Sequence, residues 1–139
     1  MMHHGRDEAD WDQLAEAGLE FLIEQARLSR STSYTELNAV LERRTGLRRF
    51  DFARADERAA MGHLLALIVE RNRPTTHLMI SALVIYLNAN DAGTGFYGLA
   101  QDLGELPRKA SAQMKEEFWV GQVSKLHGYY SPRRRGNSA

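Results

Sequence analysis

Apolar residues recur at helical spacing along most of this chain of 139 residues. Residues three or four apart lie on one face of a helix, so a run with this spacing presents a single apolar stripe. The clearest example predicts an amphipathic helix over residues 9–29. Its core stripe comprises Trp11, Leu14, Ala15, Gly18, Leu22 and Ala26.

Two further helices follow, and both have sequence signals that mark their ends. The segment SYTE at residues 33–36 is a capping box. In such a box the hydroxyl of Ser33 accepts a hydrogen bond from an unpaired amide of the first turn, and the side chain of Glu36 accepts one from the backbone amide of the cap. Gly46 is placed to end this short helix. A third helix is expected over residues 54–72, with Pro74 closing it. The inward residues of the two helices are Leu37, Val40 and Leu41, then Met61, Leu64, Leu65, Ile68 and Val69.

The segment HLMISALVIYL at residues 77–87 is rich in β-branched residues, and both of its alternating faces are apolar. This pattern predicts a strand over residues 78–87 with Leu83 and Ile85 fully buried, although a run of this length also fits a buried helix. A loop over residues 88–95 and helices over residues 96–103 and 110–127 complete the pattern. The last helix is anchored by Phe118, Val123 and Leu126, with Trp119 beside them.

These elements predict an α+β fold that is mainly helical, with about five helices and one short strand or small β-hairpin. The length is that of one domain. We expect a single globular domain over residues 1–130 and a disordered basic tail over residues 131–139.

The segment AGTGFYGLA at residues 92–100 contains the pattern G-x-G-x-x-G of dinucleotide-binding turns. Such a turn follows a strand directly and belongs to a parallel sheet, whereas residues 88–92 intervene here and few other strands are expected. We therefore interpret Gly93 and Gly95 as turn residues with positive φ, and Gly98 as a site of close helix packing. A weaker reading remains, in which the amides of residues 94–97 hold one anion.

Few residues indicate a disulfide, a metal site or a catalytic site. The chain has no cysteine, which excludes disulfides and thiolate sites, and its five histidines lack the i, i+4 spacing of a helical metal site. Asp91 lies in a turn whose spacing does not fit a calcium loop. Ser81 is expected to form a hydrogen bond within the core. The sequence predicts no catalytic residue, cofactor or metal, and a cytoplasmic protein without a membrane segment.

The net charge is zero, but the charges are unevenly spread. Residues 1–24 carry seven acids against Arg6 alone, and residues 25–58 carry eight arginines against five acids. Such asymmetry can create a basic face for nucleic acid, although it is also typical of solvated helices whose charges pair with one another.

The order of helix, capped helix, longer helix, strand and glycine-rich turn is that of a winged-helix domain. Residues 31–97 also resemble the C-terminal domain of O6-alkylguanine DNA alkyltransferases and alkyltransferase-like proteins. The similar segments are TSYTEL at residues 32–37, RAAMGHL at 58–64 and NRP at 72–74. The family's reactive cysteine motif falls on ISAL at residues 80–83, so the resemblance implies DNA contact without alkyl transfer. The pattern SALV followed by GTGFYGLA is also similar to small uncharacterised prokaryotic proteins.

Two functions from different classes follow. The first is a non-enzymatic DNA-binding domain whose arginines contact phosphates. Its predicted site is Arg43, Arg44, Arg48, Arg49, Arg54 and Arg58. The second is a protein-interaction module, with a protein partner or a second copy of the chain. Its predicted anchors are Tyr86, Phe96, Tyr97, Trp119, Tyr129 and Tyr130.

Overall fold

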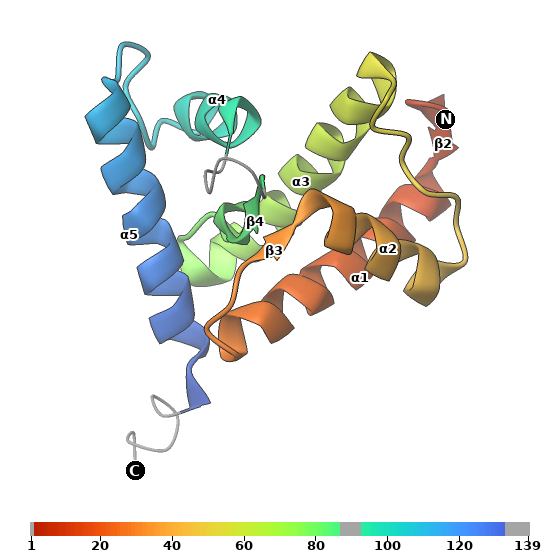
Figure 1. Ribbon diagram of the computed structural model, residues 1–139, viewed down its shortest axis with the longest axis horizontal. Coiled ribbons are helices and arrows are strands. Elements are labelled where there is room, and N and C mark those ends of the chain that lie inside the picture. The colour runs from red at the N-terminus through yellow and green to blue at the C-terminus, as the bar shows by residue number, and fades with distance from the viewer. Residues whose placement is uncertain (1, 87–92, 133–139) are drawn as a thin grey trace.

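The computed structural model describes residues 2–86 and 93–132 (Figure 1). Most of the predicted loop, including Asp91, and most of the predicted basic tail lie outside these residues. Within them the fold is mainly helical, as predicted, with two very short sheets. The elements are β1 (Met2–His3), β2 (Arg6–Asp7), α1 (Glu8–Arg27), β3 (Thr32–Ser33), α2 (Tyr34–Thr45), α3 (Ala55–Thr76), the 3₁₀ helix η1 (Ile80–Leu83), β4 (Val84–Ile85), α4 (Thr94–Asp102) and α5 (Ala112–Tyr130).

Helix α1 forms the centre of the helical packing. It begins at Asp7, whose carboxylate accepts a hydrogen bond of 2.8 Å from the amide of Asp10. The apolar stripe predicted for this helix is buried throughout. The contacts of α1 with α2 and with α3 are the most extensive of those between the described elements.

The start and the end of α2 are those predicted. Ser33 Oγ accepts a hydrogen bond from the amide of Glu36 at 3.0 Å, and Gly46 ends the helix in the left-handed region with φ +73°. The carboxylate of Glu36 accepts from the hydroxyl of Thr32 at 2.5 Å. Glu36 therefore ties the first turn of α2 to β3.

Helix α3 runs past the predicted end. Pro74 lies inside the helix, which continues to Thr76 and ends at His77 in the left-handed region with φ +60°. Proline has no amide hydrogen, so one backbone hydrogen bond of the helix is missing at Pro74. The amide of His77 still donates to the carbonyl of Arg73 at 2.7 Å.

The strand predicted over residues 78–87 is mostly wrong. Among its described residues, 78–86, η1 is a 3₁₀ helix and the one strand is β4, over two residues. Element η1 is surrounded by α1, α3 and α5, so its side chains are buried in every direction and no alternating pattern can develop. Leu83 is fully buried, as predicted, whereas Ile85 is only partly buried.

The small sheet near the centre is parallel. Thr32 of β3 pairs with Val84 of β4, and Ser33 pairs with Ile85. The wing of a winged-helix domain is instead an antiparallel hairpin, and no such hairpin follows α3 within the residues described.

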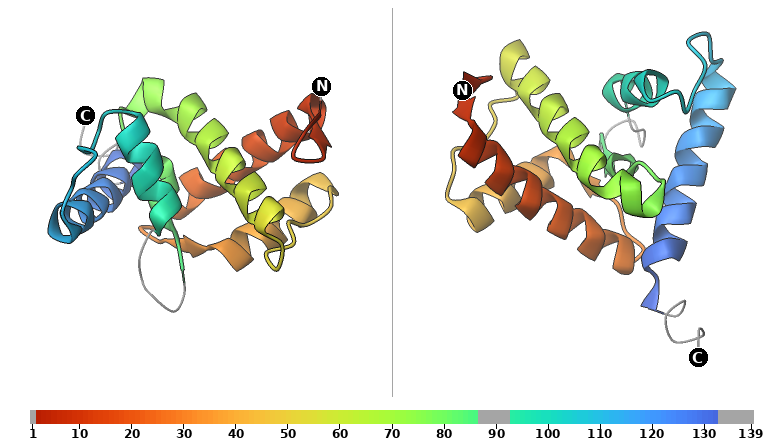
Figure 2. Two further views of the ribbon diagram at one scale, coloured as in Figure 1. Left: turned by 90° about the horizontal axis from the view of Figure 1, so that it is seen from above. Right: turned by 180° about the vertical axis from the view of Figure 1, so that it is seen from behind.

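Helices α4 and α5 lie at the opposite end of the molecule from the N-terminal hairpin formed by β1 and β2 (Figures 1 and 2). Two side chains of α5 fix it to the segment that contains η1. Gln122 accepts from the amide of Met79 at 2.7 Å, and Trp119 donates its indole N–H to the carbonyl of Ala82 at 2.9 Å. Helix α4 is not among the elements that pack closely on α3.

Candidate binding groove between α3 and α4

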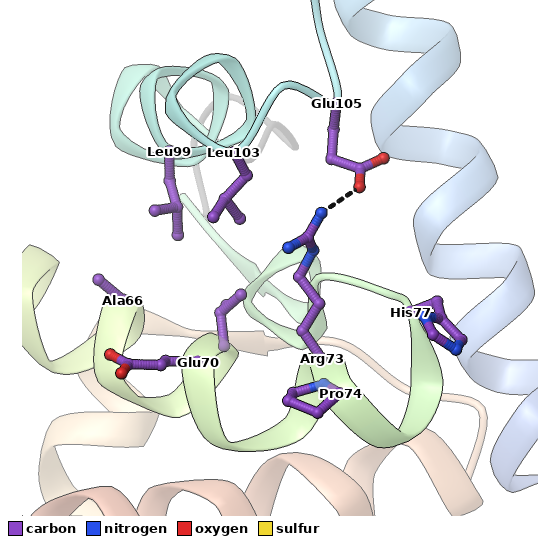
Figure 3. A pocket seen from close by; sticks show the side chains of 9 residues that line it. Ala66, Glu70, Arg73, Pro74, His77, Leu99, Leu103 and Glu105 are labelled. Carbon is purple, nitrogen blue, oxygen red and sulfur yellow. Dashed lines mark hydrogen bonds and ion pairs between the residues drawn. The ribbon is translucent and has the colours of Figure 1, made fainter.

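A cavity of about 510 Å³ lies between α3 and α4. Leu99 and Leu103 point from α4 toward α3, as Figure 3 shows. Beside them, Arg73 of α3 forms an ion pair of 2.5 Å with Glu105, in the segment after α4. The lining residues are Ala66, Val69, Glu70, Arg73, Pro74, His77, Leu99, Leu103 and Glu105.

A second cavity of about 360 Å³ shares Ala66 and Leu99 with the first. We call the two together the α3–α4 groove. A third cavity, of about 200 Å³, shares Tyr34 with the second. The second cavity is lined by Tyr34, Gly62, Leu65, Ala66, Ser81, Gly95, Phe96, Gly98, Leu99 and Asp102, and the third by Tyr34, Thr35, Phe52, Arg58, Met61 and Tyr86.

Three glycines of the groove face open space. A Cβ atom built on Gly62, Gly95 or Gly98 would have no heavy atom within 4 Å outside its own helix and neighbours. The prediction that Gly98 allows close helix packing is therefore wrong. Gly95 lies inside α4 without the predicted positive φ, whereas Gly93 does have positive φ, at +84°.

The groove was not predicted from the sequence, although the spacing of small residues is a signal for it. Gly62 and Ala66 are four residues apart on α3, and Gly95 and Gly98 are three residues apart on α4. Small residues at such spacing leave a depression on a helix. The sequence does not indicate that the two depressions face each other.

The hydroxyl of Ser81 is buried beside the groove without a partner. Ser81 lies in η1, is 3% exposed and lines the second cavity, and its Oγ has no hydrogen-bond partner in the described structure. The predicted hydrogen bond of this residue within the core is therefore absent. Buried hydroxyls are nearly always paired, so an orphan of this kind needs an explanation.

Tyr34 joins the second and third cavities. Burial is the main cause that holds the pKa of its phenol well above the usual range, and the neighbouring Tyr86 raises it further. The two rings lie 4.7 Å apart between centroids. The phenol of Tyr34 is therefore neutral near pH 7 and is no general base.

The six arginines of the predicted DNA site do not form a free basic face. Arg44 makes two hydrogen bonds of 2.9 Å with Glu24, and Arg49 forms an ion pair of 2.8 Å with Glu42. Arg54 pairs with Asp56 in the same way. Exposed pairs of this kind contribute little to stability, but they neutralise the charge that DNA binding would use.

The remaining arginines divide between structural and exposed positions. Arg48 forms an ion pair of 2.9 Å with the buried Glu57, and Arg58 donates to the carbonyl of Phe52 at 2.7 Å. Arg43 is exposed and has no polar partner among the described residues. Of the six, only Arg58 lines one of the three cavities described above.

The predicted aromatic anchors are mostly part of the core. Phe96 and Tyr130 are buried, and the hydroxyl of Tyr130 accepts a hydrogen bond of 2.8 Å from Asn72. Tyr97, Trp119 and Tyr129 are partly buried. Tyr86 is half exposed, at 49%, and lines the third cavity.

Comparison with protein-family models, with curated proteins and with solved structures finds no match to this chain. The described residues include no group of three or more histidines, cysteines and acids able to hold a metal ion. Within the same residues, none of the helices has the length and hydropathy to cross a membrane.

Proposed function

We propose that this chain is a non-catalytic interaction module whose α3–α4 groove receives an amphipathic helix of a partner protein. The observation that carries the proposal is the open space in front of Gly62, Gly95 and Gly98 on both walls of the groove. Small residues on facing walls let a third helix approach closely, because no side chain holds its backbone away. This deepens the interaction-module hypothesis, with the groove replacing most of the predicted aromatic anchors.

The shape and chemistry of the groove favour a helix over a smaller ligand. From Gly62 to His77 its α3 wall is about 22 Å long, at about 1.5 Å per helical residue. That length matches roughly four helical turns. Leu65, Val69 and Leu99 provide an apolar lining on which residues spaced i, i+3, i+4 and i+7 of a helix can dock.

Charge at the rim adds a preference for a basic residue in the partner. Glu70 lines the groove, is exposed and has no ion-pair partner among the described residues. The other charged rim residues are neutralised, since Arg73 pairs with Glu105, and Asp102 pairs with Arg108. A lysine or arginine of the docked helix opposite Glu70 would complete this pattern.

A phage-displayed library of amphipathic peptides, roughly 16 residues long, tests the proposal. Peptides selected on the full chain are measured against Gly98→Leu, which fills the groove from a position with free space. Their Kd is expected to rise at least about tenfold. Glu70→Lys should weaken peptides that carry a basic residue, because like charges then face each other.

Gly121→Leu is the matched control, because Gly121 also faces open space but lies on α5 outside the groove. Selected peptides should bind this variant as they bind the original chain. Equal binding to Gly98→Leu, or no enrichment of peptides at all, would contradict the proposal. Circular dichroism on each variant establishes that the fold is kept.

A further inference from the structure

Helix α4 begins at the Tyr34 end of the groove. It has nine residues, and its cap, Gly93, makes no side-chain hydrogen bond to the first turn. The amides that open an α-helix have no partner within the helix and carry a partial positive charge. Gly95 and Phe96, in this first turn, both line the second cavity.

Ser81 provides an independent donor in the same cavity. Its side chain is nine-tenths buried or more, and the hydroxyl has no partner within the described structure. The residue comes from η1, a separate element from α4, and lines the same space as Gly95. The unpaired hydroxyl of Ser81 and the first turn of α4 thus border one cavity, an arrangement that suits a hydrogen-bond acceptor.

The charged groups around the cavity leave room for a negative charge. Among the described residues, Asp102 is the one acid that lines it, and this residue lies at the far end of α4 in an ion pair with Arg108. Tyr34 carries no charge near pH 7, since the ordinary pKa of a phenol is already about 10 and burial raises it further. Arg58 lies in the adjoining cavity, which shares Tyr34.

We propose that this end of the groove binds an oxyanion, either a carboxylate or a phosphate, through the first-turn amides of α4 and the hydroxyl of Ser81. The inference rests on the proposed function in one respect, namely that the oxyanion is carried by the docked helix. With a basic residue near Glu70 at the other end of the groove, the oxyanion fixes the direction in which that helix lies. The site itself is testable with free anions.

The experiment is an NMR titration of the ¹⁵N-labelled full chain with inorganic phosphate and, separately, with acetate at constant ionic strength. Saturable shifts are expected at the amides of Thr94, Gly95 and Phe96. Ser81→Ala should raise the Kd about tenfold, since a hydrogen bond to a charged group is lost. Thr94→Pro removes one amide donor at a position where helices accept proline, and should also weaken binding.

Ser124→Ala is the matched control, since Ser124 is an exposed serine on α5. It should leave the Kd unchanged. Ser81→Ala removes an unpaired hydroxyl, so its fold should be at least as stable, and weaker binding cannot be ascribed to unfolding. Tighter binding of phosphate would indicate a phosphorylated partner, and tighter binding of acetate would indicate a partner that carries a carboxylate.

Shifts that do not saturate, or that are equal in Ser81→Ala, would overturn the oxyanion site. Peptide selection on the groove is a separate readout, so the two proposals can fail independently. Peptides that bind in the absence of anion-dependent shifts would leave the interaction module standing and remove the oxyanion site. Anion-dependent shifts without any selected peptide would support the oxyanion site and contradict the interaction module.

Discussion

At the scale of single residues, two glycines of one short motif have opposite roles. Gly93 has φ +84° and ψ 171°, a conformation that is essentially restricted to glycine. A Cβ atom at this position would lie 2.2 Å from Cε2 of Tyr86. Gly98 has an ordinary helical backbone and faces the open groove, so nothing in the free protein requires a glycine there.

Alanine substitutions should therefore have opposite effects on stability. Gly93→Ala should lower the free energy of unfolding by about 1–3 kcal/mol, because the backbone is strained and the ring of Tyr86 must move. Gly98→Ala should raise it by about 0.5–1 kcal/mol through helix propensity alone. Urea unfolding followed by circular dichroism measures both. A Gly93→Ala protein as stable as the original would show that the close contact with Tyr86 does not exist in solution.

Features that depend on neighbouring residues in sequence could be predicted, and features that depend on distant ones could not. Ser33 and Gly46 were predicted correctly as helix ends, because capping involves only the adjacent turn. The open space at Gly98 and the orphan hydroxyl of Ser81 depend on how α4 and η1 are placed relative to α3. No local pattern contains that information.

At the scale of elements, the N-terminal hairpin of β1 and β2 is anchored by a buried arginine. Arg6 is 2% exposed, donates to the carbonyl of Arg48 at 3.0 Å and lies 4.2 Å from the ring centroid of Phe50. Glu57 lies 3.9 Å from the same guanidinium. The hairpin is thereby joined to the segment between α2 and α3. This contact could not be predicted from the sequence, because the two segments are far apart along the chain.

The same hairpin brings His3 and His4 to His63 of α3, with ring centroids 6.1 and 5.3 Å from that of His63. Burial, and then the positive charges of His4 and His3, lower the pKa of His63. The unfolded chain therefore binds this proton more readily than the folded one. The free energy of unfolding should fall as the pH drops below about 6.5, the ordinary value for histidine.

Urea unfolding between about pH 7.5 and pH 5 checks this prediction. His63→Gln should flatten the pH dependence, because the group with the lowered pKa is gone. His127→Gln is the control, since His127 lies on α5 beside the carbonyl of Arg30 and away from the cluster. A steeper fall in His63→Gln than in the original chain would exclude the proposed cause.

The prediction of a strand over residues 78–87 failed for an element-scale reason. Periodicity identifies a strand only when one face of the segment is exposed. Element η1 is enclosed by three helices, so a 3₁₀ turn and a strand give the same uniformly apolar pattern. The burial of Leu83 was predictable, and the backbone conformation was not.

At the scale of the whole molecule, ion pairs cancel part of the uneven charge along the chain. Acids of α1 pair with arginines far along the sequence, as Glu24 does with Arg44 and Asp12 with Arg71. The acidic segment, residues 1–24, and the arginine-rich segment, residues 25–58, are linked by the ion pair of Glu24 with Arg44. This pairing weakens the case for DNA binding, which stays a prediction.

Fluorescence anisotropy with a labelled DNA duplex tests that prediction against the interaction module. We expect no binding with micromolar protein at about 50 mM salt, because phosphates would have to displace the paired carboxylates. Binding that weakens with log salt at a slope of about −0.9 per phosphate contact would instead support the DNA site. In that case, Arg43→Ala should lower the slope by nearly one unit, because Arg43 is exposed and unpaired within the described structure.

The parallel pairing of β3 with β4 has a consequence for the order of folding. Thr32 and Val84 are partners across a segment that contains α2, α3 and η1. Closing a flexible loop of that length costs roughly 3–4 kcal/mol, which a sheet of two residues per strand cannot repay. Helices α1 and α2 are close in sequence and meet at little entropic cost. We therefore expect the sheet to form late, once α3 has shortened the loop.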